Sequence, residues 1–188
     1  MSHELLRDRA FHRLLLDADR DLAAEARTGG CLECGGRLHR ADYTRKPAGA
    51  PELEAVRFSF CCATEGCRKR RTPGSLRFLG RRVYLGAIVV LASVLWQGLT
   101  PRRVKRLEGV LGVSERTLGR WRRWWLRDFS RSGFWRSRRG RFDRPVAPDR
   151  LPASLFERFG GDEESRLLSM LRFLLPISGG QGLAAQAL

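Results

Sequence analysis

Two cysteine turns constrain this chain more than any other feature of its sequence. The first reads Cys31-Leu-Glu-Cys34-Gly-Gly, and the second reads Cys62-Ala-Thr-Glu-Gly-Cys67. With two or four residues between its cysteines, each turn can bring both sulfurs to one tetrahedral ion. The glycines allow the backbone to bend beneath that ion. Two such turns, joined by loop and strand, predict a zinc ribbon over residues 29–79 with Cys31, Cys34, Cys62 and Cys67 as ligands.

The fifth cysteine, Cys61, fits the ligand set less well. Five residues separate it from Cys67, whereas four separate Cys62 from Cys67, and two to four is the usual range. Cys61 is therefore predicted to be a packed residue or a spare thiol, and His39 a surface or packed histidine. Four thiolates close the coordination shell, so the predicted Zn²⁺ is structural. The sequence does not distinguish zinc from iron at such a site. The redox alternative would need a strand-to-helix turn of a parallel sheet, which this pattern does not supply.

The charge balance points to a polyanionic partner. The chain has 36 Lys and Arg against 20 Asp and Glu, for a net charge of +16. A GC-rich genome would explain arginine in place of lysine, but it does not explain the excess, so nucleic acid is the first candidate. Arg68, Lys69 and Arg70, with Arg71, follow the second cysteine turn and are predicted to meet phosphates from its rim. The alternative is a solvated charge run.

Residues 100–125 have the pattern of a helix-turn-helix. Thr100 and Pro101 suit a helix start, Gly112 permits a turn, and Ser114 suits the cap of a second helix. The inward faces would carry Val104, Leu107, Leu111 and Val113, then Leu118, Trp121 and Trp125. A buried helix at Val83 to Trp96 would complete a trihelical core within residues 80–128. Glu108 fits less well, because close helix packing there favours a small residue, and Gly109 beside it would relieve the crowding.

The second of these helices carries the predicted base contacts. Arg116 and Arg120 lie four residues apart and so share a face, and arginine pairs bidentately with guanine. The outward set is Glu115, Arg116, Thr117, Arg120 and Arg123. Phosphates would be held from the first helix by Arg102 and Arg103. The alternative is an ordinary helical hairpin with a basic face. Core packing, rather than stacking on bases, is predicted for the aromatic residues Trp124, Trp125, Phe129, Phe134 and Trp135.

The remaining segments complete a fold that is mainly α with a small β zinc ribbon. Residues 1–28 predict an amphipathic helix whose apolar face includes Leu14, residues 129–150 a basic linker, residues 151–175 C-terminal helices, and residues 176–188 a disordered tail. The terminal helices are open to three interpretations: packing on the core, forming a homodimer, or docking a partner. The most apolar segment is too short to span a bilayer, which predicts a cytoplasmic, nucleoid-associated protein.

The order of these motifs resembles the DNA-binding N-terminal part of bacterial insertion-sequence transposases. It is also similar to an uncharacterised family of small bacterial proteins associated with mobile elements. The residues that carry the resemblance are CLECGG, CCATEGCRKRRTP and LGVSERTLGRWRRWW, within about residues 31–127. The resemblance implies recognition of double-stranded DNA at an element's ends or promoter.

One departure from those transposases bears on catalysis. They continue into an RNase H-like domain with three metal-binding carboxylates, whereas the adjacent Asp162, Glu163 and Glu164 are better explained by a helix start. The chain is therefore predicted not to be an enzyme, and a separate DDE-type transposase or integrase would supply catalysis. The alternatives are a transcriptional regulator unrelated to transposition and a ribbon that binds RNA or a protein.

Overall fold

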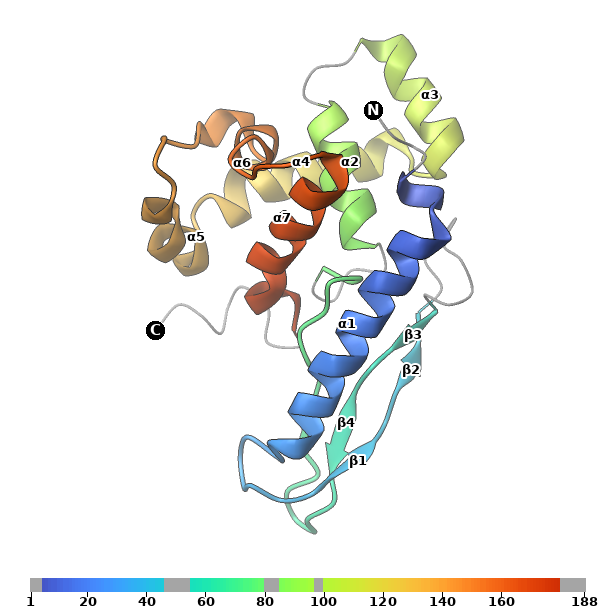
Figure 1. The fold of residues 1–188 in the computed structure, drawn as a ribbon, viewed down its shortest axis with the longest axis vertical. Helices are drawn as coiled ribbons and strands as arrows, with labels where there is room; N and C mark the ends of the chain where they lie inside the picture. The colour runs from blue at the N-terminus through green and yellow to red at the C-terminus, as the bar shows by residue number, and fades with distance from the viewer. Residues whose placement is uncertain (1–4, 46–54, 80–84, 97–99, 180–188) are drawn as a thin grey trace.

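The computed structural model describes residues 5–45, 55–79, 85–96 and 100–179, without the side chains of residues 103, 104, 106 and 110. Figure 1 shows a helical body with a narrow ribbon of strands at one end, and the long helix α1 runs along both. The predicted roles of Arg103, Val104 and the tail at 180–188 lie outside the described residues. None of the described helices has both the length and the apolar character needed to cross a membrane.

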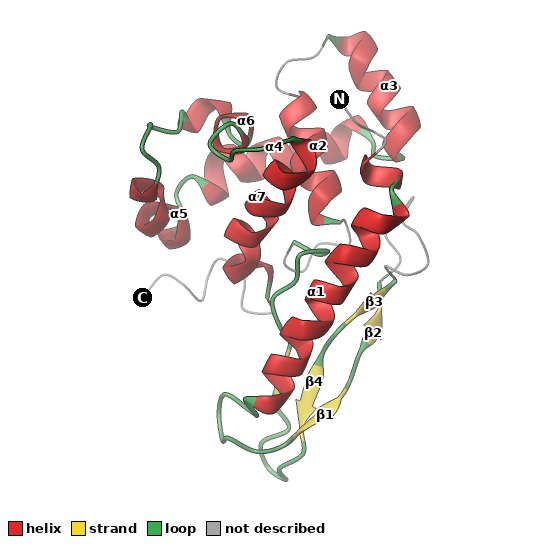
Figure 2. Ribbon diagram, viewed as in Figure 1, coloured by secondary structure: helices red, strands yellow, loops and turns green. Residues whose placement is uncertain are grey.

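The described chain is mixed α and β, with helix predominating (Figure 2). Two elements open the chain, η1 (Leu5–Arg7) and α1 (Arg9–Thr28). The central helices are α2 (Gly86–Trp96), α3 (Pro101–Leu111), α4 (Glu115–Arg123) and the π-helical η3 (Trp124–Phe129). The C-terminal helices are α5 (Gly133–Arg138), η4 (Arg139–Arg141), η5 (Pro148–Arg150), α6 (Ala153–Phe156) and α7 (Glu163–Ser178).

The strands form two small antiparallel sheets. They are β1 (Leu38–Arg40), β2 (Tyr43–Thr44), β3 (Val56–Arg57), β4 (Phe60–Cys62) and β5 (Arg70–Arg71). The order β1-β4-β5 makes one sheet, in which Leu38 is paired with Cys62, and β2 pairs with β3 in the other. We call residues 31–45 and 55–71, which hold these strands and both cysteine turns, the ribbon.

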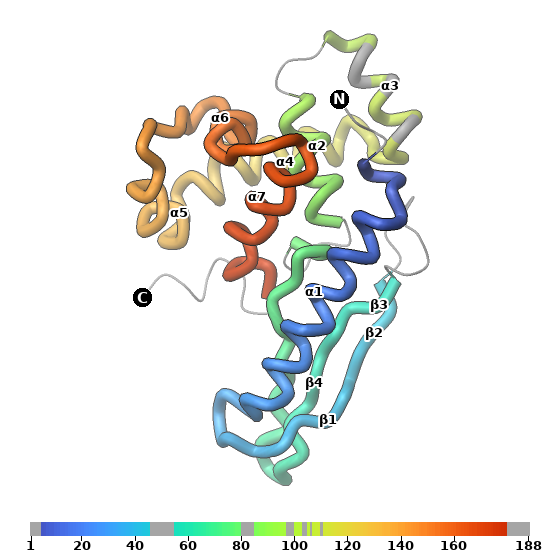
Figure 3. The backbone as a smooth tube through the Cα atoms, in the orientation of Figure 1, coloured from blue at the N-terminus to red at the C-terminus, as the bar shows by residue number. Residues whose placement is uncertain are grey.

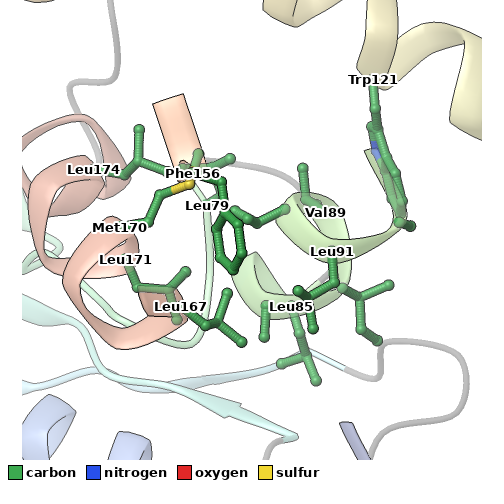
Figure 4. Close-up of a cluster of buried hydrophobic side chains, with 14 of the residues drawn as sticks. Leu79, Leu85, Val89, Leu91, Trp121, Phe156, Leu167, Met170, Leu171 and Leu174 are labelled. Atoms are coloured by element: carbon green, nitrogen blue, oxygen red, sulfur yellow. The ribbon is translucent and has the colours of Figure 1, made fainter. Parts of the chain in front are cut away.

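The larger hydrophobic core lies in the helical body. Helix α2 is its centre, because every residue from Gly86 to Ser93 is buried. Figure 4 shows α7 facing α2 through Leu167, Leu171 and neighbouring apolar side chains. The predicted core role of the aromatic residues is confirmed, since all five are buried: Trp124, Trp125, Phe129, Phe134 and Trp135.

A second, smaller core joins the ribbon to the C-terminal half of α1. Ala23 and Ala26 of α1 pack with Leu38, Phe60 and the cysteines of the ribbon. The N-terminal half of α1 packs instead in the larger core through Phe11 and Leu15. One helix therefore spans both cores, and no separate linker is needed to hold the ribbon to the body.

A buried ion pair ties three segments that are distant in sequence. The Arg77 Nε donates to the Asp19 carboxylate at 2.9 Å, and both side chains are fully buried. The same carboxylate accepts the backbone N–H of Leu76 at 2.7 Å, and Arg77 Nη2 donates to the Val56 carbonyl at 2.8 Å. Helix α1, strand β3 and the segment 72–79 are thus fixed together. Figure 3 shows the last of these returning beside α1 towards α7.

A second buried arginine extends this tie to α7. Arg57 Nη2 donates to the carbonyls of Pro73 at 2.7 Å and Ser178 at 3.0 Å. Burial lowers the pKa of the Arg57 guanidinium, and the nearby Asp19 carboxylate acts in the opposite direction. Both guanidiniums also lie over the Phe78 ring, at 5.7 Å for Arg57 and 5.2 Å for Arg77.

Three expectations about the elements are corrected by the structure. Residues 129–150 are not a linker, because α5, η4 and η5 lie there and Phe134 and Trp135 are in the core. Helix α7 continues to Ser178, so the predicted tail does not begin at residue 176. Leu14, expected on the inward face of α1, is 43% exposed.

Candidate functional site

The four predicted ligands lie together at the tip of the ribbon. The sulfurs of Cys31, Cys34, Cys62 and Cys67 are all within 4.8 Å of one another, and no disulfide joins them. The Sγ atoms of Cys31 and Cys67 are 3.7 Å apart, and those of Cys34 and Cys62 are 3.5 Å apart. A tetrahedral ion with metal–sulfur bonds of about 2.3 Å would place its ligands about 3.8 Å apart. The four cysteines are therefore close enough to bind one metal ion.

Short backbone hydrogen bonds shape each cysteine turn. In the first, Gly35 N donates to the Cys31 carbonyl at 2.8 Å and Cys31 N donates to the Gly36 carbonyl at 2.9 Å. In the second, Cys67 N donates to the Thr64 carbonyl at 3.2 Å. These local bonds shape each turn, and the bond from Ala63 N to the Arg37 carbonyl at 2.9 Å joins the second turn to the first half of the ribbon.

Gly36 lies where no side chain fits. A Cβ at this position would lie 2.2 Å from the Thr64 hydroxyl and 3.2 Å from the sulfurs of Cys34 and Cys62. The first of these distances is far below van der Waals contact, so even alanine would force the Thr64 side chain or the backbone to shift. The glycine after the first cysteine pair therefore permits the close approach of the second pair.

Hydrogen bonds lower the pKa of two of the thiols. At Cys31 the cause is the backbone hydrogen bonds from Glu33 and Cys34. At Cys62 the hydrogen bond with the Thr64 hydroxyl is the largest cause, and it brings the pKa to about 6. Thiolates are the form in which cysteine binds a metal, so these two sulfurs are already biased towards it.

The pKa of Cys67 is moved in the opposite direction. The backbone hydrogen bond from Lys69 lowers it, but hydrogen bonds with the thiol of Cys34, burial and the thiol of Cys31 outweigh this and raise it to about 12. The sulfurs therefore cannot all be thiolates at little cost unless a cation joins them. A divalent metal would supply that charge and release the remaining protons.

Cys61 and His39 lie outside the sulfur cluster. Cys61 is half-buried, and its thiol donates to the Arg68 carbonyl at 3.4 Å. His39 is exposed and pairs with Cys61 across the β1–β4 ladder. The choice of Cys62 over Cys61 as part of the cluster is thus confirmed.

The basic residues after the second turn divide into two groups. Arg68 and Lys69 are exposed, and Arg68 has a left-handed backbone with φ of 44°. Arg71 does not belong on the rim as expected, because its guanidinium donates to the carbonyls of Ala26, at 2.8 Å, and Gly30. It therefore ties β5 to the end of α1.

Arg70 helps to line a groove beside the sulfur cluster, and the sequence analysis did not predict this groove. The groove has a volume of about 610 Å³ and is lined by Tyr43, Arg45, Lys69 and Arg70, among others. The guanidiniums of Arg45 and Arg70 lie 5.1 Å and 5.5 Å from the centre of the Tyr43 ring. No sequence signal marks this groove, since residues 43 and 45 are far from residue 70 along the chain.

Helices α3 and α4 form a tight pair. Gly112 ends α3 in the left-handed conformation, with φ of 61°, which is why glycine suits this turn. Ser114 then caps α4, accepting from Thr117 N at 3.4 Å. The three-residue link is closed by Val113, which is 2% exposed and fills the space between the helices.

Glu108, which was predicted to fit poorly between the helices, caps the start of α4. Its carboxylate accepts the backbone N–H of Glu115, in the first turn of α4. A helix N-terminus has unpaired N–H groups, and a carboxylate is the acceptor they favour. Glu108 therefore fixes the start of α4 from the preceding helix.

The outward face of α4 is basic, with one correction. Arg116, Arg120 and Arg123 are exposed, as is Glu115, whereas Leu118 and Trp121 are buried. Thr117 was expected to face outward, but it is 4% exposed. Its hydroxyl accepts from Arg120 Nη2 at 3.0 Å and so helps to orient that arginine. On α3, Arg102 is exposed.

Comparison with protein-family models gave no match, and comparisons with curated proteins and with solved structures gave none either. The resemblance to the front end of insertion-sequence transposases therefore stays a prediction. What the structure adds is a set of four cysteines that could hold one metal ion and a basic helix whose start is capped from the helix before it.

Proposed function

We propose that this chain is a sequence-specific DNA-binding protein that uses α3 and α4 as a helix-turn-helix. In this arrangement α4 enters the major groove of duplex DNA, and Arg116 and Arg120 contact base edges. Glu115 and Arg123 lie beside them, and Arg102 on α3 holds a phosphate.

One observation carries the proposal: α4 is buried on one face and wholly polar and basic on the other. Leu118 and Trp121 hold it on α2 and α3, while Arg116, Arg120 and Arg123 face solvent. Capping by Ser114 and Glu108 fixes where this helix starts. A recognition helix needs this combination, because base contacts require arginines held at a defined depth in the groove.

The proposed role of the metal centre is structural. Four thiolates around Zn²⁺ leave no position for a substrate, and the ribbon has only a small core of its own. Such a centre carries a net charge of −2, so Arg68 and Lys69 are electrostatically favoured beside it. With Arg70, they would meet phosphates from the ribbon, which lies at the opposite end of the molecule from α4 (Figure 1).

The biological setting that we propose is a mobile element. The chain would recognise element ends or a promoter, and a separate DDE-type transposase or integrase would supply the chemistry. The motif order described above supports this. A neighbouring gene for an integrase-like protein would favour it over a conventional transcriptional regulator.

Selection from random duplex DNA tests the proposal. Purified protein of known metal content is incubated with the library at several salt concentrations. An enriched motif is expected, and the double substitution Arg116→Ala and Arg120→Ala should remove preference at its guanines. Each bidentate arginine–guanine contact is worth about 1–3 kcal/mol, so discrimination should fall by roughly 5-fold to 150-fold per arginine.

Two control variants separate base reading from charge. Arg9→Ala with Arg13→Ala removes two exposed arginines that are also four apart on a helix, and it should leave the motif intact. Arg102→Ala should weaken binding to all duplexes alike. Full discrimination by the Arg116 and Arg120 variant would refute the contact assignment. Binding without any motif, or preference for RNA in competition, would refute sequence-specific DNA recognition.

A further inference from the structure

A second basic surface lies beyond η3, in the segment that the sequence presents as a linker. Between residues 131 and 147 there are six arginines and a single acidic residue, Asp143. Five of the arginines are exposed, and we call them the α5 surface: Arg131, Arg136, Arg139, Arg141 and Arg144.

Within the described residues, the side chains of the α5 surface make no ion pair or hydrogen bond. Some exposed arginines elsewhere do make them. Arg20 pairs with Asp17 at 2.6 Å, and Arg150 pairs with Glu157 at 2.9 Å. The positive charge of the α5 surface is therefore available to an anionic partner.

The backbone beneath these arginines is held rigidly. Phe134 and Trp135 are buried, and the Ser132 hydroxyl caps α5 by accepting from Trp135 N at 3.1 Å. Further along, the Phe142 ring packs against Phe173, with centroids 5.5 Å apart. Arginines on a fixed backbone lose less entropy on binding than arginines in a free linker would.

The side chains of the α5 surface favour a nucleic acid over a membrane as its partner. A membrane surface would need apolar side chains to insert, but the exposed large hydrophobic residues of the described chain are Leu14, Leu32 and Val56, none of them here. Guanidinium groups bind phosphates bidentately, and rows of them suit a polyphosphate backbone.

We propose that the α5 surface binds the phosphate backbone of the same duplex whose bases α4 reads. This inference rests on the proposed function. Helix α4 continues directly into η3, so fifteen residues from Glu115 to Phe129 form one rod, about 22 Å long at 1.5 Å per residue. At 3.4 Å per base pair, that length corresponds to about six base pairs, and the α5 surface follows the end of the rod.

The test compares charge removal on two faces of the full-length, metal-loaded protein. The first variant is Arg136→Gln, Arg139→Gln and Arg141→Gln. The control is Arg7→Gln, Arg9→Gln and Arg13→Gln, which removes the same charge from exposed residues in η1 and at the start of α1. Figure 1 places that end of α1 on the opposite side of the view from α5. Binding to the selected duplex is measured against salt concentration, with thermal unfolding as the check on folding.

The α5 variant should lower the slope of log K against log salt by roughly two to three, since each lost phosphate contact removes about 0.9. In a footprinting experiment on the selected duplex, the α5 variant should lose protection of the phosphates at one edge of the site. The selected motif should be unchanged. Replacing the same three residues with lysine should retain most of the slope. The control should retain its slope.

Two results would overturn the inference, and they are distinguishable. If the α5 and α1 variants had equal slopes and footprints, the α5 surface would not contact DNA, and the role of α4 would stand. If the unsubstituted protein selected no duplex and bound none, the proposed function would fail and this inference with it.

Discussion

Cys61 and Cys62 are neighbours in the chain, yet only Cys62 belongs to the sulfur cluster. Adjacent residues of a strand point to opposite faces, so one faces the turn of Cys34 and the other the Arg68 carbonyl. Spacing alone was enough to distinguish them, because a ligand pair must fit a tight turn. The four-cysteine cluster is thus the part of the candidate site that sequence predicts best.

Serine substitution should separate these two cysteines. Cys62→Ser and Cys67→Ser are expected to lower the bound metal from one ion per chain to almost none, and to lower Tm, since metal binding contributes to folding. Cys61→Ser should retain the metal and most of the stability. Metal content by elemental analysis and Tm by calorimetry measure both effects. Equal loss in the Cys61 variant would contradict the ligand set.

Other residues were placed wrongly because neither a charge run nor helical periodicity shows the hydrogen bonds of a side chain. Arg71 looked like part of an exposed run, but its acceptors are the carbonyls at the end of α1, about forty residues earlier. Thr117 looked outward by helical periodicity, yet its hydroxyl bonds to Ser114 and Arg120. Periodicity gives the face of a helix and not the hydrogen bonds at its edges.

At the scale of elements, α3 and α4 were predictable because their ends carry local signals. Pro101, Gly112 and Ser114 mark these ends, and the structure places the helix boundaries there. The segment after η3 was harder, because its arginines and proline are typical of a linker. Phe134 and Trp135 indicated that this segment packs in the core. Their partners, Phe173 of α7 and Phe129 of η3, are known only from the structure.

The cap across α3 and α4 should be measurable. Glu108→Ala removes the acceptor of Glu115 N and is expected to cost about 1 kcal/mol, as loss of a helix N-cap does. For a chain of this size that corresponds to a fall in Tm of about 2–4 °C. Glu108→Gln retains a side-chain oxygen and should recover most of the loss. Equal Tm values for the alanine variant and the parent would contradict the capping role.

At the scale of the whole molecule, the Asp19 and Arg77 pair holds the ribbon to the helical body. Sequence did not predict it, since 58 residues separate the two and buried ion pairs leave no periodic signal. In the sequence, Asp19 is one of several charged residues within α1, and nothing distinguishes it from the others. The way in which the ribbon is attached to the helical body is therefore known only from the structure.

Breaking that pair should be costly. Asp19→Asn removes the buried carboxylate charge that pairs with Arg77 and acts on the nearby Arg57 guanidinium, and a loss of about 3–5 kcal/mol is expected. Asp17→Asn is the matched control, because Asp17 lies two residues earlier and its pair with Arg20 is exposed. That control should cost at most about 1 kcal/mol. Urea unfolding measures both, and similar losses would show that the buried pair is not a principal tie.

The bond from Arg57 to the Ser178 carbonyl has a consequence for synthesis. The two residues are 121 positions apart. At a translation rate of about 5–20 residues per second, roughly 6–24 s pass between their emergence from the ribosome. During that interval both cysteine turns are complete and can take up metal, but the guanidinium in β3 lacks one of its acceptors. The ribbon of a nascent chain therefore reaches its final packing only when the end of α7 arrives.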